Sequence, residues 1–284
     1  MLNIKNTRMS DFKTLLCCIV KQENKYIREF VEYYKNIGIT HIVVYDNNDL
    51  DGEHLDDVIG DYIDDGFVNV IDCRGKKCYQ MPAYTEAYEI YGKSYDWLLF
   101  FDVDEFFWSK YDSIGDFLSL NLFRGFDAIL INWRVYTDNN DPYYREGNVI
   151  DRFPTPMNDD VCCEYDFPEN NHVKTIIRGG LNNIMFGNPH CTRNVIRCCN
   201  TNGVPVRNYP FTKYVHDNAY LKHYNTKTAE EYAHKLKRGF CDLNRPNYEP
   251  LLQRNFFHIN EVTPEKIEVF KRELGVDVSY LLKK

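Results

Sequence analysis

Apolar and polar positions alternate in blocks along the first 135 residues, and each block has the length of a strand or a helix. Residues 14–20 form a short, continuous apolar run, whereas in residues 24–37 apolar side chains recur every three or four positions. Further predicted strands lie at 41–45, 67–72, 97–101 and 128–135, and further predicted helices at 53–64 and 82–91. This alternation predicts the α/β class, with a Rossmann-like, doubly wound and mostly parallel sheet.

The pattern loosens after residue 138. Short strands are predicted there at 173–178 and 184–186. Regularity returns at Thr228, because Thr-Ala-Glu-Glu is a capping-box pattern that predicts a helix reaching Arg238. A last helix is predicted from Thr263-Pro264 to Gly275, since proline is favoured in the first turn and glycine just after the end.

One predicted strand runs directly into carboxylates. Residues 97–101 are all aromatic or aliphatic, and Asp102-Val103-Asp104-Glu105 follows them. Alternate residues of an extended chain point to the same side, so Asp102 and Asp104 can present oxygens together at the carboxyl edge of the sheet, where open α/β folds bind ligands. Carboxylates in this place also serve as turn residues or helix caps. Like charges crowded beside apolar residues need positive compensation, however, and hard oxygen ligands favour Mg²⁺ or Mn²⁺.

Other polar residues follow the neighbouring strands. Lys21 and Glu23 come after the first strand, Asp46 after the second and Arg74 after the third. Because the carboxyl ends of parallel strands meet at one edge of a sheet, this set resembles a nucleotide pocket.

Several basic residues further along the chain are candidates for phosphate binding. His223 and Lys227 stand four positions apart, just before the capped helix, and could contact one phosphate group. Lys174 either binds phosphate or is an exposed lysine on an edge strand. His190, in Asn188-Pro189-His190, is either a site residue or a hydrogen-bonded turn histidine.

Composition excludes some classes of protein. The 284 residues carry a formal net charge of −8, so the chain lacks the broad basic surface that nucleic-acid binding requires. Six of the ten cysteines stand as three pairs of sequence neighbours, and no Cys-x-x-Cys occurs. This argues against a zinc knuckle and fits free thiols in a reducing compartment. The first residues contain no run long enough for a signal peptide or a membrane span. We expect a cytoplasmic protein, with peripheral contact at the inner face of the membrane through its basic C-terminal part.

Taken together, these segments resemble the GT-A glycosyltransferases of family 2 and family 92. The resemblance rests on 18–23 (CIVKQE), 101–106 (FDVDEF), 173–176 (VKTI), 188–190 (NPH) and 223–227 (HYNTK). It covers residues 14 to 240 in order, and no resemblance is identified for the tail beyond Arg245. It implies a GT-A domain over 1–245, with a nucleotide-sugar half at 1–135 and a less regular acceptor and diphosphate-closing half at 136–245, and a C-terminal helical tail at 246–284.

The resemblance also implies a function. It implies transfer of a hexose from a UDP-sugar to a glycan or lipid-linked acceptor, with inversion, as in polysaccharide biosynthesis. Asp102, Asp104 and His223 would hold Mn²⁺ or Mg²⁺. The residues that would bind the donor are Lys21, Glu23, Asp46, Arg74, Gln80, Tyr84, Asp102, Lys174 and Lys227.

The general base is less clearly marked. Asp138 follows a strand beside the expected acceptor face, and Glu105, Glu164 and Asp166 are alternatives.

Two other functions stay open. A nucleotidyltransferase acting on a sugar phosphate would use a similar sheet, but no Gly-rich basic loop follows the first strand. A non-catalytic carbohydrate-binding protein would explain the aromatic residues at 136–144 but not the carboxylate cluster.

Overall fold

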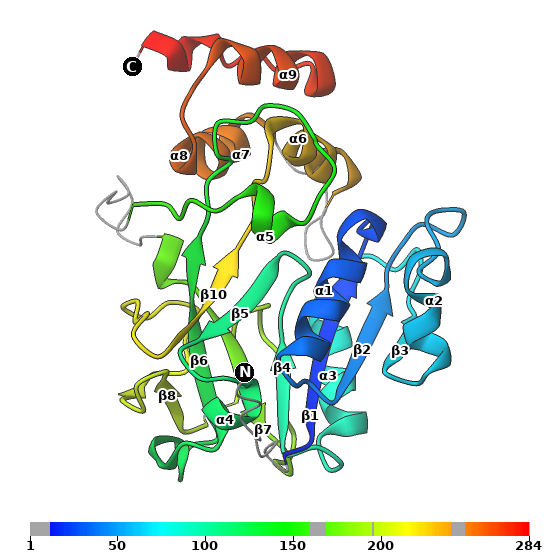
Figure 1. Cartoon of the computed structure of the whole chain (residues 1–284), viewed down its shortest axis with the longest axis vertical. Helices are drawn as coiled ribbons and strands as arrows, with labels where there is room; N and C mark the ends of the chain where they lie inside the picture. The colour runs from blue at the N-terminus through cyan, green and yellow to red at the C-terminus, as the bar shows by residue number, and fades with distance from the viewer. Residues whose placement is uncertain (1–11, 159–168, 195, 240–247, 284) are drawn as a thin grey trace, which may run out of the picture.

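A mixed, mostly parallel sheet forms the centre of the computed structural model, which describes residues 12–158, 169–194, 196–239 and 248–283 (Figure 1). Its strands are β1 (Thr14–Val20), β2 (His41–Asp46), β3 (Val68–Asp72), β4 (Trp97–Phe100), β5 (Glu105–Ser109), β6 (Ala128–Val135), β7 (Val173–Arg178), β8 (Cys198–Asn200), β9 (Pro205–Val206) and β10 (Ala219–His223). Their order is β3-β2-β1-β4-β7-β6-β10-β5, and β8 pairs with β6 and β9. The strands β1 to β4 are parallel, whereas β7 runs antiparallel between β4 and β6.

Helices cover both faces of this sheet. The α-helices are α1 (Asn24–Asn36), α2 (Asp56–Asp64), α3 (Gln80–Tyr91), α4 (Ile114–Leu118), α5 (Val149–Arg152), α6 (Ala229–Arg238), α7 (Tyr248–Leu251), α8 (Phe257–Ile259) and α9 (Pro264–Leu274). Short turns of other helix types are η1 (Asn121–Phe123), η2 (Glu169–Asn171), η3 (Leu252–Phe256) and η4 (Ser279–Lys283). The apolar stripe of α1 packs into one hydrophobic cluster, and α3 packs into a second cluster on the other face. The predicted α/β class and doubly wound sheet are confirmed.

The predicted element boundaries hold best where the apolar pattern is strongest. The strands predicted at 14–20, 128–135 and 173–178 have the same bounds in the structure. The strand predicted at 184–186 is wrong, because only Phe186 pairs there, in an isolated bridge with Thr192. The strands β5 and β10 were not predicted, and they position part of the site.

The C-terminal helices form a third hydrophobic cluster. Helix α6 shares this cluster with α9 and with residues 252–281, and Figure 1 shows these helices together beyond one end of the sheet. The predicted domain boundary at residue 245 lies outside the described residues. Across the described ranges, no helix has the length and apolar character needed to cross a membrane.

Candidate functional site

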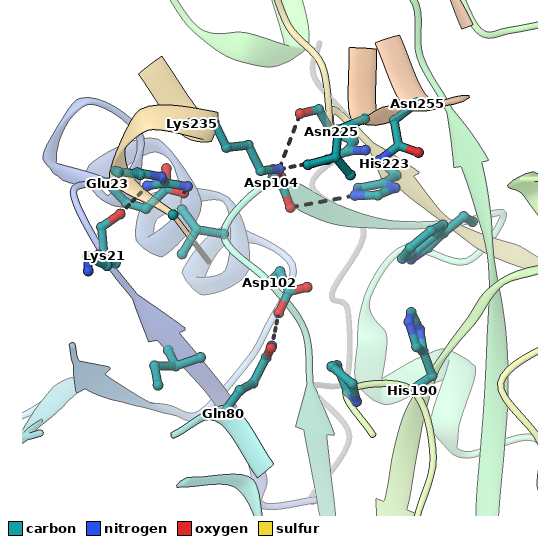
Figure 2. A pocket seen from close by; sticks show the side chains of 17 residues that line it. Lys21, Glu23, Gln80, Asp102, Asp104, His190, His223, Asn225, Lys235 and Asn255 are labelled. Carbon is teal, nitrogen blue, oxygen red and sulfur yellow. Dashed lines mark hydrogen bonds and ion pairs between the residues drawn. The ribbon is translucent and has the colours of Figure 1, made fainter. Parts of the chain in front are cut away.

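A pocket of about 300 Å³ lies at the carboxyl ends of β1 and β4 (Figure 2). Polar side chains from the sheet, from α6 and from the C-terminal helices line it. They are Lys21, Glu23, Gln80, Asp102, Asp104, His190, His223, Asn225, Lys235, Arg238 and Asn255. The place is the one where parallel strands of an open α/β sheet present ligand-binding loops.

Asp102 is held from three sides. Its Oδ1 accepts hydrogen bonds from Gln80 at 2.8 Å and from the Tyr84 hydroxyl at 2.9 Å, and its Oδ2 lies 2.7 Å from the Lys174 ammonium. Lys174 is fully buried, whereas the Asp102 side chain is 33% exposed. Burial alone would raise the pKa of Asp102, but Lys174 and these hydrogen bonds hold it below its usual value. Asp102 therefore stays ionised at neutral pH.

Asp104 is buried and pairs with a lysine from α6. Its Oδ2 lies 2.7 Å from Lys235 Nζ, and Lys235 also donates to the Asn225 side-chain oxygen at 2.7 Å. The other oxygen, Oδ1, faces His223 Nε2 at 3.7 Å. Burial alone would raise the pKa of Asp104, but Lys235, His223 and Lys227 lower it well below its usual value. The Asp104 carboxylate is therefore ionised at neutral pH.

Strand β10 brings His223 to Asp104. His223 lies opposite Glu105 in the antiparallel pairing with β5, and the next residue, Tyr224, donates its backbone N–H to the Asp104 carbonyl at 2.9 Å. Burial lowers the pKa of His223 to about 3, so the ring is neutral at pH 7. Its ring centroid lies 4.0 Å from that of Trp133. Within the described part of the chain, the buried Nδ1 atom of His223 has no hydrogen-bond partner.

Glu105 lies behind the pocket and is fully buried. It accepts a hydrogen bond from the Trp133 indole at 2.6 Å and one from the Asp102 backbone N–H at 2.8 Å. Burial raises the pKa of Glu105 well above its usual value. These contacts fix the turn that carries Asp102, and the structure gives Glu105 no access to a substrate in the pocket.

Helix α6 reaches across to the end of β1. Arg238 donates to the Glu23 side chain and to the backbone carbonyls of Lys21 and Gln22. Glu23 and Lys21, both predicted site residues, therefore line the pocket together with a cation from a distant part of the chain.

Five of the predicted donor-binding residues lie outside the pocket wall. Asp46 forms a buried ion pair with Arg74 at 2.8 Å, beside the end of β1. Tyr84 and Lys174 stand behind Asp102.

Lys227 also lies outside the pocket wall. It lines a smaller cavity next to the pocket, and its ammonium lies 4.4 Å from the centre of the Tyr26 ring. These residues support the site residues or border them, rather than face the pocket.

The structure does not bring Asp138 to the pocket. Its carboxylate is 1% exposed and lies 2.6 Å from Lys266 Nζ, in the contact between the end of β6 and α9. Its backbone N–H donates to Asn260 at 2.7 Å. Asp138 thus ties the C-terminal helices to the sheet. The alternative bases Glu164 and Asp166 lie outside the described residues.

Four polar residues of the pocket have no predicted role: Asn225, Lys235, Arg238 and Asn255. The sequence does carry a signal for two of them, because Lys235 and Arg238 stand three positions apart in a capped helix and so share one face. Asn255 lies in the η3 turn, whose sequence pattern gave no indication of a site.

The donor set fits a divalent cation only in part. Asp104 Oδ1 and His223 Nε2 face each other at 3.7 Å, and carboxylate oxygen and neutral imidazole both bind Mn²⁺. Both oxygens of Asp102 already accept hydrogen bonds. No group of three metal-binding side chains occurs in the described ranges. Asp104 and His223 would therefore need a substrate to supply further ligands, as Mg²⁺ sites with substrate phosphates do.

The sequence model of glycosyltransferase family 92 matches residues 13–268, which extends the predicted resemblance into the C-terminal tail. Among curated proteins, none matches the chain. The crystal structure of S. aureus TarS has a TM-score of 0.42 and 11% identity over 94% of this chain, which spans only 44% of that chain. The crystal structure of S. aureus TarS 1-349 has a TM-score of 0.42 and 13% identity, and 93% of this chain covers 79% of that one.

Proposed function

Because the chain belongs to glycosyltransferase family 92, we propose that it transfers a hexose from a UDP-sugar to a hydroxyl of a glycan or lipid-linked acceptor, with inversion. The observation that carries the proposal is the meeting of Asp102 and Asp104 with Lys21, Lys235 and Arg238 around one pocket at the strand ends. A diphosphate needs cationic partners, and a sugar needs ionised carboxylates that accept hydrogen bonds from its hydroxyl groups. Both kinds of group are present.

In the proposed reaction, the acidic and basic residues of the pocket have different roles. Asp104 and His223 would hold Mn²⁺ or Mg²⁺, which would act as a Lewis acid that stabilises the leaving diphosphate. Lys235 and Arg238 add positive charge on the same side. Asp102, fixed by its three partners and exposed to the pocket, would accept a hydrogen bond from a donor hydroxyl.

The first test is calorimetric binding of UDP to the full chain, with Mn²⁺ and again with EDTA. The proposal expects binding that needs Mn²⁺. Asp104→Asn should weaken this binding at least tenfold, because the variant loses a charged ligand of the cation. Asp64→Asn makes the same charge change on the exposed end of α2 and serves as the matched control, with unchanged affinity.

Two results would contradict the proposal. UDP affinity that is the same in Mn²⁺ and EDTA would refute the metal role while leaving the donor class standing. Absence of UDP binding in either condition would refute the donor class and favour the nucleotidyltransferase or carbohydrate-binding alternatives.

If UDP binds, UDP-glucose, UDP-galactose and UDP-N-acetylglucosamine can be compared by the rate at which the protein hydrolyses each of them.

A further inference from the structure

Each carboxylate in the pocket wall already has a cationic partner. Glu23 pairs with Arg238, Asp102 with Lys174 and Asp104 with Lys235. In each pair the cation lies within hydrogen-bonding distance of a carboxylate oxygen, so each carboxylate is engaged in an ion pair before an acceptor hydroxyl arrives. A pocket group without such a partner is therefore the better candidate for the base of the proposed reaction.

His190 is such a group. It lies in the segment after β7 and lines the pocket. In Figure 2 the His190 and Gln80 side chains enter the pocket from different sides. Its backbone N–H donates to the Asn188 side chain at 2.8 Å, and its backbone carbonyl accepts from the Thr175 hydroxyl. The backbone that carries the ring is thus fixed at two points.

The hydrogen bond of the ring defines its tautomer. His190 Nδ1 lies 2.8 Å from the Val173 carbonyl oxygen. A carbonyl oxygen can only accept, so Nδ1 carries the hydrogen and Nε2 keeps its lone pair. No described residue forms a hydrogen bond with Nε2. Trp133 packs edge-on against the ring with 5.3 Å between centroids, which restricts rotation of the imidazole.

We propose that His190 is the general base of the glycosyl transfer, an inference that rests on the proposed function. Nε2 takes the proton of the acceptor hydroxyl while that oxygen forms its bond to the anomeric carbon. The bond between this carbon and the diphosphate oxygen breaks, and its electron pair leaves with the diphosphate. The proton on Nε2 then passes to solvent.

The environment keeps His190 in the form that this step requires. Burial and the nearby Lys174 ammonium lower the pKa of His190 to about 3, so the ring is neutral at pH 7. A base of this strength suffices late in the reaction, because the acceptor oxygen becomes strongly acidic only as its new bond to carbon forms.

The test uses His190→Ala in the full chain and compares two nucleophiles. The probes are the three UDP-sugars named above with Mn²⁺, and the readout is UDP release. Hydrolysis needs a base for water, so His190→Ala should lower it 10²-fold to 10⁴-fold. Azide carries no proton, so azide-dependent UDP release, with formation of the glycosyl azide, should stay within about twofold of wild type. His41→Ala, at the other end of β2 from the pocket, is the control and should change neither rate.

The outcomes separate this proposal from the proposed function. Hydrolysis by His190→Ala within a few-fold of wild type overturns the role of His190 alone. An equal loss of the water and azide reactions also overturns it, because it shows a general defect of the pocket. Binding of UDP with Mn²⁺, measured by calorimetry, confirms that the variant is folded. Absence of UDP release by the wild-type protein from all three donors overturns both proposals.

Discussion

The buried ion pair between Asp138 and Lys266 offers a quantitative test of how the C-terminal helices are attached. The ammonium lies 2.6 Å from the carboxylate, and the two side chains are 1% and 0% exposed. Lys266 also donates to the Glu261 carbonyl at 2.9 Å and to the Asn140 side chain at 3.2 Å. Lys266→Met keeps the length of the side chain and removes its charge, which leaves the carboxylate buried without its cation.

The expected loss is large because the remaining charge cannot reach water. Removing one partner of a buried pair costs about 3–5 kcal/mol, whereas replacing both partners with neutral groups costs less. Lys266→Met should therefore lower the free energy of unfolding by about 3–5 kcal/mol, and adding Asp138→Asn to it should restore part of that loss. Urea denaturation of the single and double variants measures both quantities.

The loss should also depend on pH. Burial raises the pKa of Asp138, and the Lys266 ammonium opposes this, so removing Lys266 raises the pKa further. The folded variant then binds a proton that the unfolded chain has already lost, so its stability falls as pH rises above the ordinary carboxyl range. The deficit relative to wild type should be smaller at pH 5.5 than at pH 7.5, by up to about 1.4 kcal/mol per pH unit.

Three results would refute this reasoning. A loss below about 1 kcal/mol would mean that the pair contributes little to attachment of the helices. A loss equal at pH 5.5 and 7.5 would mean that the carboxylate does not titrate as argued. If folded Asp138→Asn lost UDP-sugar hydrolysis 10²-fold, the assignment of Asp138 as the general base would regain support.

Two further stability predictions concern partly buried residues. Burial lowers the pKa of His172 to about 4, so the unfolded chain binds its proton first and stability is lost as pH falls below about 6.5. Between pH 7 and pH 5, the free energy of unfolding of His172→Gln should therefore fall by about 1–2 kcal/mol less than that of wild type, as measured by urea denaturation. An equal fall in the two proteins would contradict this. A Cβ atom on Gly179 would lie 1.8 Å from the Tyr95 carbonyl oxygen and 2.7 Å from that of Gly92. Gly179→Ala should cost about 1–3 kcal/mol, seen as a lower Tm, and an unchanged Tm would show that the backbone yields freely.

The sequence predicts the sheet half of the molecule well because its signals are local there. The apolar run at 14–20 and the i, i+3, i+4 pattern around Phe30 each depend on residues close together in the chain. The capping box at Thr228 and the proline and glycine at the ends of α9 are equally local, and the structure has all of them.

The rest of the site depends on pairing between distant segments. Nothing local indicates that 219–223 pairs with 105–109, yet this pairing brings His223 to Asp104. Likewise, Asp138 follows a strand as a site residue would, and only the packing of α9 places Lys266 against it. Sequence pattern therefore identified the acidic pair, but it could not identify which cation each acid meets.

The pocket is built from two parts that have separate hydrophobic interiors. The turn between β4 and β5 supplies Asp102 and Asp104, whereas Leu251 and Asn255 reach the pocket from helices whose apolar side chains pack among themselves. A substitution within the helical cluster can shift the wall that Leu251 and Asn255 form, together with Lys235 of α6, while the strands keep their own hydrophobic clusters. Substitutions in the helices can therefore change the shape of one side of this cavity while the side that carries Asp102 and Asp104 stays the same. Related genes could diverge in this way.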